Sequence, residues 1–252
     1  MTKFLQVFIF LTGAGLIATA QERISVDRPD QTEGATLTLP HYFQAEFGFG
    51  KENADKENYN LIYPTTLFKY GLSNRFELQL LGKFISSHEQ MIPATKITMG
   101  FVPVLIGLRT ALWEEKNILP KTSLIIRAGI PGLVSKNFKP DHLTSLALLA
   151  MENTVTKKIG LSYNIGVAWD GFSSTPVWFY SLSSGYDLGK RWDAFLEIFG
   201  SSQKNEMPQN SIDTGLGFYI NNNMKLDTYA GIGITDAAIN NFFGVGFSFR
   251  LH

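Results

Sequence analysis

The feature that most constrains this chain is the alternation of large apolar residues with small or polar ones at a period of two, without any long apolar run after residue 20. From Ile159 to Trp169 every odd position is large and apolar, and every even position is small or polar. The same alternation occurs over 192–198, 224–234 and 245–251. A period of two is typical of β-strands with one apolar and one polar face. The sequence therefore predicts an all-β protein.

Residues 1–20 form a separate unit, which we expect to be a cleaved secretory signal peptide. Lys3 gives a positively charged start, residues 4–17 are mostly apolar, and Ala18-Thr19-Ala20 is a small-residue cleavage site before Gln21. The alternative is a retained membrane anchor, but the apolar run is short for that role. No later stretch reaches the ~18 apolar residues that a membrane helix needs.

Short polar turns recur along the chain, centred near residues 74, 115, 157, 190 and 222. Longer segments rich in polar residues, glycine or proline lie between them, at Gly50–Asn58, Ser86–Lys96, Pro131–Asp141, Gly171–Thr175, Ser201–Asn210 and Thr235–Ala238. Five short turns and six longer loops would join twelve strands. An even number of antiparallel strands, with short turns at one end and longer loops at the other, is typical of a bacterial outer-membrane barrel.

A soluble β-sandwich would also alternate, and composition decides between the two. Only 17% of the residues are charged, against about 25% in a typical soluble domain. The faces opposite the apolar positions carry mainly Gly, Ser and Asn, and aromatic residues cluster at strand ends as in interfacial girdles. We therefore predict a transmembrane antiparallel up-and-down β-barrel of about 12 strands in the outer membrane of a Gram-negative-type bacterium. Residues 21–39 would form a periplasmic N-terminal segment and residues 40–252 the barrel.

Several short motifs occur in the order found in one known family. They are Asp27–Glu33, Tyr70–Leu78, Gly107-Leu108-Arg109, Gly129-Ile130-Pro131-Gly132 and the Gly-x-x-Phe-x-Phe-Arg run near the end of the chain. Together they resemble the phenol-degradation meta-pathway outer-membrane proteins, which are transporter-type β-barrels. The resemblance implies an outer-membrane barrel that transports hydrophobic or aromatic small molecules, without implying a demonstrated substrate.

Charged residues on the predicted inward faces are candidates for lining the lumen: Glu46, Lys69, Glu77, Arg109, Arg127, Asp193, Glu197, Asp213 and Arg250. They could form a polar track that selects solutes, or ion pairs that merely fill the interior. Lys69 and Glu77 are the expected local pair, because the Ser73-Asn74 turn joins their strands. Asp27, Arg28 and Asp30 could fold into the periplasmic mouth and pair with these charges, or form a rigid solvated entry to the first strand.

Lumen size depends on the small inward residues of the later strands. The small residues are glycines, which are expected to leave space on one wall: Gly160, Gly166, Gly215, Gly217, Gly231, Gly233, Gly244 and Gly246. Phe195, Phe199 and Phe242 would narrow the pore. Twelve strands lie between the about eight that leave a filled interior and the about sixteen that leave an open channel. We therefore predict passive diffusion of small, hydrophobic or aromatic molecules through a narrow lumen.

Enzymatic and nucleic-acid functions are disfavoured. The absence of cysteine excludes disulfides, thiolate zinc sites and iron–sulfur clusters. The zero net charge argues against nucleic acid as a partner. The four histidines, His41, His88, His142 and His252, lack metal-ligand spacing, so no cofactor or metal is predicted.

The sequence leaves two alternative functions open. One is a structural or surface-binding barrel with a closed lumen, and the other is an outer-membrane hydrolase. The nearest local set for the hydrolase is His142 with Ser145 and Asp141. The expected partners are outer-membrane lipid, a small-molecule solute and the barrel-insertion machinery, which would recognise the terminal strand Phe243–His252. That strand lacks the usual final aromatic, since Phe249 stands three residues from the end. The sequence assigns no oligomeric state.

Overall fold

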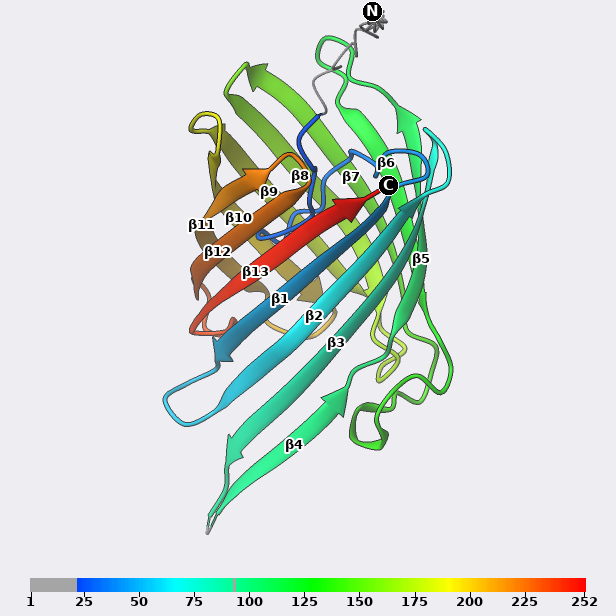
Figure 1. The fold of residues 1–252 in the computed structure, drawn as a ribbon. Coiled ribbons are helices and arrows are strands. Elements are labelled where there is room, and N and C mark those ends of the chain that lie inside the picture. Colours follow the sequence, from blue (N-terminus) through cyan, green and yellow to red (C-terminus); the bar gives the residue numbers. More distant parts are fainter. Residues whose placement is uncertain (1–21, 93) are drawn as a thin grey trace, which may run out of the picture.

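In a computed structural model, which describes residues 22–92 and 94–252, the chain forms a closed antiparallel β-barrel (Figure 1). The signal peptide expected over residues 1–20 lies outside the described part. Among the described residues, no helix is long and apolar enough to cross a membrane. The elements are β1 (Phe43–Asn53), β2 (Tyr59–Gly71), β3 (Phe76–Gln90), β4 (Thr95–Phe101), β5 (Leu105–Trp113), β6 (Lys121–Gly129), the 3-10 turn η1 (Lys136–Phe138), β7 (Ser145–Thr156), β8 (Ile159–Trp169), β9 (Val177–Asp187), β10 (Trp192–Gln203), β11 (Gln209–Asn221), β12 (Met224–Gly233) and β13 (Asn241–Leu251).

Twelve of these thirteen strands form the ring, which closes where β1 pairs with β13. The remaining strand, β4, pairs with the outer half of β3, while β5 pairs with the half of β3 nearer the short turns. Thus β4 and β5 are one strand interrupted around Pro103, which has no backbone N–H to donate to a ladder. The predicted twelve-stranded up-and-down barrel is confirmed, with this one break in its wall.

The short turns occur where the sequence placed them, between β2 and β3, β5 and β6, β7 and β8, β9 and β10, and β11 and β12. The longer loops lie at the opposite end. One expectation was wrong: Ser86–Lys96 is largely strand, because β3 continues to Gln90 and β4 begins at Thr95. Its polar residues resemble a loop, but His88 stacks on Tyr59 at 4.4 Å and pairs with Ile97 across the hairpin.

The distribution of side chains is inverted relative to a water-soluble protein. Outward residues such as Ile165, Val245 and Leu251 are more than half exposed although they are apolar. Inward residues such as Glu46 and Arg109 are buried although they are charged. A closed ladder with an apolar outside satisfies the backbone without water, which is what a hydrocarbon environment requires.

The chain that precedes β1 lies inside this ring. Residues 22–42, which we call the N-terminal segment, are drawn in dark blue in Figure 1 and run through the barrel interior. Ile24 N donates to Asn222 O at 2.8 Å, and His41 N donates to Gly71 O at 2.7 Å, so both ends of the segment are held near short turns. Between these ends, Ala35 is fully buried.

Candidate functional site

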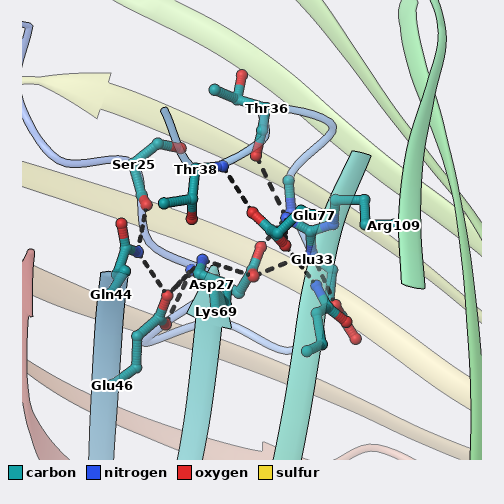
Figure 2. Close-up of polar contacts among 12 residues, drawn as sticks. Ser25, Asp27, Glu33, Thr36, Thr38, Gln44, Glu46, Lys69, Glu77 and Arg109 are labelled. Atoms are coloured by element: carbon teal, nitrogen blue, oxygen red, sulfur yellow. Dashed lines mark hydrogen bonds and ion pairs between the residues drawn. The ribbon is translucent and has the colours of Figure 1, made fainter. Parts of the chain in front are cut away.

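The N-terminal segment is anchored to one wall of the lumen by ion pairs. The Asp27 carboxylate accepts hydrogen bonds from Lys69 Nζ of β2 and Arg109 Nη2 of β5, each at 2.9 Å. The Asp27 backbone N–H donates to Glu46 Oε2 of β1 at 3.0 Å. Figure 2 shows these side chains converging from three strands onto the segment. The segment is therefore bound by the strands that begin the barrel.

A second carboxylate of the segment extends this anchor. Glu33 forms a bidentate ion pair with Arg127 of β6, with both N–O distances 2.5 Å, and also contacts Arg109 Nη2 at 2.9 Å. Thr38 N donates to Glu77 Oε2 at 2.6 Å, and Arg109 Nη1 lies 3.7 Å from Glu77 Oε1. We call this group the charge cluster; its members are Asp27, Glu33, Glu46, Lys69, Glu77, Arg109 and Arg127.

The charge cluster stabilises ionised carboxylates in the interior of the barrel. Burial alone would raise the pKa of Asp27, but the positive charges of Arg109 and Lys69 outweigh it and hold that pKa well below its usual range. Buried ion pairs gain energy only when each charge is matched. Arg109 is fully buried, and carboxylates of both the segment and the wall surround it.

The facing wall, formed by β8–β12, holds the segment through both neutral and charged groups. Gln31 N donates to Glu197 Oε2 at 2.7 Å, and Thr32 Oγ1 contacts both Ser181 Oγ, at 2.7 Å, and Glu197. Asn164 Oδ1 accepts from the backbone N–H of Glu33 at 2.8 Å.

Three further side chains of the segment reach this wall, and one of them, Arg23, pairs with Asp187 of β9 at 3.1 Å. Asp30 accepts from Ser183 Oγ at 2.9 Å, and Arg28 forms an ion pair with Asp227 at 3.0 Å. The segment is therefore held on this wall by contacts between side chains as well as by contacts of its backbone.

The two walls differ in charge. The wall of β1–β6 contributes three cations against two carboxylates to the charge cluster, namely Lys69, Arg109 and Arg127 against Glu46 and Glu77. Inward positions of β10–β12 carry four carboxylates against one lysine, namely Asp193, Glu197, Asp213 and Asp227 against Lys225. The segment matches both, since Asp27 and Glu33 face the first wall and Arg28 faces the second.

Two cavities lie on opposite sides of the segment. The one toward the longer loops has a volume of about 390 Å³, with Gln31 and Glu33 of the segment among its lining residues. Its apolar lining consists mainly of Leu146, Leu148, Phe179, Phe199, Ile239 and Phe242. The one toward the short turns has a volume of about 430 Å³ and is lined by charged and polar groups that include Arg28, Asp30 and Lys225. On β9, Ser181 lines the first cavity and Ser183 the second, so residues 30–33 form the partition.

Several of the inward glycines do not leave the space that the sequence suggested, although Gly160 does, since a Cβ there would meet only Asn153 O, at 3.8 Å. A Cβ on Gly166 would collide with the Phe179 ring, and a Cβ on Gly231 would collide with the Phe242 ring. Gly215 lies under Phe195 in the same way. These glycines accommodate aromatic rings lying against the wall, so the free volume lies toward the middle of the lumen.

The structure brings most of the predicted site residues together. Eight of the nine inward charges are buried and Asp193 is half-buried. Glu46, Lys69, Glu77, Arg109 and Arg127 meet in the charge cluster, Asp193 pairs with Lys225 at 2.7 Å, and Glu197 stands opposite Asp213 in the β10–β11 register. Arg250 lies apart, near the short turns, where it donates to Asn223 Oδ1 and to Glu22 O.

One predicted pair differs. The ion pairs of Lys69 are with Asp27 and Glu46, whereas Glu77 lies beside Arg109. In the β2–β3 register Lys69 stands opposite Gln79, two residues from Glu77, so the segment carboxylate reaches the ammonium instead. Asp27, Arg28 and Asp30 lie inside the barrel with the contacts given above.

Sequence reasoning also missed several residues of the site. Lys225 and Asp227 share the parity of the inward face of their strand, so the alternation rule could have found them. Glu33 lies in the motif Asp27–Glu33, but nothing local marks it as a partner for Arg127. Asn164 and Ser181 are ordinary inward polar residues whose role depends on the segment.

Other chemistry receives no support from the described residues. They include no group of three or more His, Cys, Asp or Glu side chains able to hold a metal ion. His142 is exposed in the β6–β7 loop, and its backbone N–H donates to Gly171 O. In the part of the chain that the structure describes, no hydrogen bond joins His142 to Ser145 or Asp141.

Comparison with known proteins agrees with this architecture. Residues 26–251 match the family described as "Putative MetA-pathway of phenol degradation". Among solved structures, an outer membrane channel from Pseudomonas putida F1 aligns with a TM-score of 0.65 at 10% identity, covering 90% of this chain and 100% of that one. The KdgM porin aligns with a TM-score of 0.57 at 9% identity, covering 83% and 99%.

A third structure, the CymD monoaromatic hydrocarbon channel, aligns with a TM-score of 0.51 at 8% identity, covering 84% of this chain and 88% of that one. At these identities the likeness concerns the fold, which is that of outer-membrane barrels. No curated protein matches the chain significantly.

Proposed function

The chain belongs to the family of the MetA pathway of phenol degradation, and we propose that it is an outer-membrane channel for small hydrophobic or aromatic molecules. Passage is by passive diffusion, and the N-terminal segment closes the lumen at rest. The observation that carries this proposal is the cavity of about 390 Å³, in which aliphatic and aromatic side chains lie beside polar groups and which ends on Gln31 and Glu33 of the segment. Pockets of this size that combine apolar and aromatic side chains with placed polar groups suit small organic molecules.

The contacts of the segment with the two walls differ in strength, and this difference determines the direction in which the segment moves. On the β1–β6 wall it is held by buried ion pairs, whose rupture is costly. On the β8–β10 wall, residues 31–33 are held mainly by hydrogen bonds, each contributing about 0.5–1.5 kcal/mol net, or about 1.5–3 kcal/mol for those to Glu197. The segment therefore opens by leaving Asn164, Ser181 and Glu197 while it stays attached to the charge cluster. This movement joins the two cavities.

A reversible lock tests this mechanism. Thr32 Oγ1 and Ser181 Oγ lie 2.7 Å apart, and the chain has no cysteine, so Thr32→Cys/Ser181→Cys introduces the protein's one possible disulfide. In a liposome-swelling assay with 4-hydroxybenzoate, whose carboxylate keeps it from crossing lipid unaided, and with a sugar of similar size, the oxidised double variant should block the swelling by 4-hydroxybenzoate. Reduction should restore it, and each single cysteine variant should be insensitive to oxidant.

Two outcomes would overturn the proposal. If the oxidised double variant, with its disulfide verified by mass, admits 4-hydroxybenzoate as fast as the reduced one, the segment is not the barrier. If wild-type protein in folded form admits neither solute, the channel itself is refuted.

The second candidate is a barrel with a permanently closed lumen that binds partners through its longer loops. The observation favouring it is the extent of the charge cluster, which fixes Asp27 and Glu33 in place. A protein that stays impermeable in reduced form and after neutralisation of Glu33 would support this candidate over transport.

A further inference from the structure

A groove of about 880 Å³ lies at the short-turn end of β10–β13 and shares Tyr219 with the polar lumen cavity. Its lining includes outward residues of β13, namely Phe247, Phe249 and Leu251, together with Ile220 at the end of β11. Leu251 is 56% exposed and Ile220 is 40% exposed, so the groove opens along the outer face of the barrel. In a barrel of this class the short turns face the periplasm.

The apolar part of the groove lies at the level of a membrane interface. Trp192, next to the groove residue Arg191, is 49% exposed and packs on Phe218 with ring centroids 4.8 Å apart. Exposed tryptophans of this kind mark the boundary between acyl chains and headgroups. The outward side chains of β13 beyond it would therefore contact acyl chains.

The polar part of the groove is positively charged. Lys190 and Arg191 are exposed in the β9–β10 turn, and Arg250 lies behind them. Among the described residues that line the groove there is no carboxylate. Arg250 already donates to Glu22 O at 2.7 Å, which leaves Lys190 and Arg191 as the cations that face outward.

We propose that this groove binds one anionic phospholipid of the periplasmic leaflet, such as phosphatidylglycerol. Its phosphate lies between Lys190 and Arg191, and one acyl chain runs along Phe249 and Leu251. An apolar surface alone would accept any lipid, and a cationic turn alone would accept any anion, but the two side by side match an anionic lipid. Each basic residue near an anionic headgroup raises the affinity roughly fivefold, so the pair accounts for about 30-fold.

The test is a titration of the whole protein, in folded form in micelles, by native mass spectrometry. Wild-type protein should bind one phosphatidylglycerol in preference to phosphatidylethanolamine. Lys190→Gln/Arg191→Gln should weaken phosphatidylglycerol binding about 30-fold and leave phosphatidylethanolamine binding unchanged. The matched control is Lys157→Gln/Lys158→Gln, which removes two exposed charges from the β7–β8 turn at the same end of the barrel but away from the groove.

The proposal is supported if only the first double variant loses phosphatidylglycerol. It is overturned if both double variants lose it equally, if neither does, or if wild-type protein binds both lipids alike. It is also overturned if inorganic phosphate competes for the site at the concentration of the lipid, since the acyl chain would then contribute nothing. Both turns are exposed, so the barrel should fold in every variant, and the heat-dependent gel shift of folded barrels verifies this.

Discussion

Neutralising Glu33 should release the N-terminal segment from the wall without unfolding the barrel. Glu33→Gln removes the bidentate pair with Arg127 and the contact with Arg109. Arg109 retains its ion pairs with Asp27, at 2.9 Å, and with Glu77, at 3.7 Å. Among the contacts of the described residues, Arg127 retains only its hydrogen bond to the neutral Gln79, at 2.9 Å. The loss of docking free energy therefore comes mainly from the guanidinium of Arg127, which remains buried without a carboxylate partner.

The size of the effect follows from that geometry. Removing one partner of a buried ion pair costs about 3–5 kcal/mol. The Glu33 side chain is 16% exposed and Arg127 is 4% exposed, so water offsets part of this. We expect a loss of about 2–4 kcal/mol from the docking of the segment on the β1–β6 wall, which is about 30- to 1,000-fold in the population of segments released from that wall as well. Arg127→Gln added to Glu33→Gln should recover part of that loss, because it removes the unpaired cation.

Cleavage before Asp27 by the endoproteinase Asp-N measures the released population, because Asp27 is buried and ion-paired inside the barrel in the docked state. Mass spectrometry identifies the product, so cuts in exposed loops do not interfere. Glu206→Gln, an exposed residue of the β10–β11 loop, is the matched charge-neutralising control and should behave as wild type. The reasoning is refuted if Glu33→Gln is cut no faster than this control, or if the double variant is cut as fast as Glu33→Gln.

Two further predictions concern the cavity and the effect of pH. Gly166→Ala should push the Phe179 ring into the cavity and slow 4-hydroxybenzoate entry in the liposome assay, whereas Gly185→Ala, whose Cβ meets nothing within 4 Å, should have no effect; equal rates would show that Phe179 does not limit passage. Because the pKa of Asp27 is depressed in the folded state, its contribution to docking is complete above its ordinary value of about 4 and is lost only as the pH falls through the lower folded value. Hydrogen exchange at the Gly34 amide, which donates to Asp27, should therefore show equal protection at pH 7 and pH 5 after correction for intrinsic rates, and a loss of protection between these values would contradict the docked geometry.

The architecture could be predicted because the evidence for it is local. The parity of Ile159–Trp169 identifies a strand and its two faces without knowledge of its neighbours. The same parity places Arg109 and Glu197 inside the barrel. Only the β3–β4 hairpin was misread, because a strand that extends past the membrane carries polar residues on both faces like a loop.

The partners of the inward charges could not be predicted, because they come from a segment that does not alternate. Lys69 is separated from Asp27 by 42 positions, and Arg127 from Glu33 by 94. Strand register predicts only which residue of the next strand lies opposite Lys69. It does not predict contacts with a chain that passes through the lumen. The motif Asp27–Glu33 was evident in the sequence, but its place in the barrel depends on three-dimensional contacts.

The division of charge between the two walls has a consequence for anything that replaces the segment. If the whole segment leaves the lumen, as distinct from the opening proposed above, a side with an excess of cations faces a side with an excess of carboxylates across the lumen. Such an arrangement produces a transverse electric field, which is strong because the walls are poorly screened. A passing molecule with a dipole, such as a ring bearing one hydroxyl group, would be turned to align with that field, whereas a ring without a dipole would gain nothing from it.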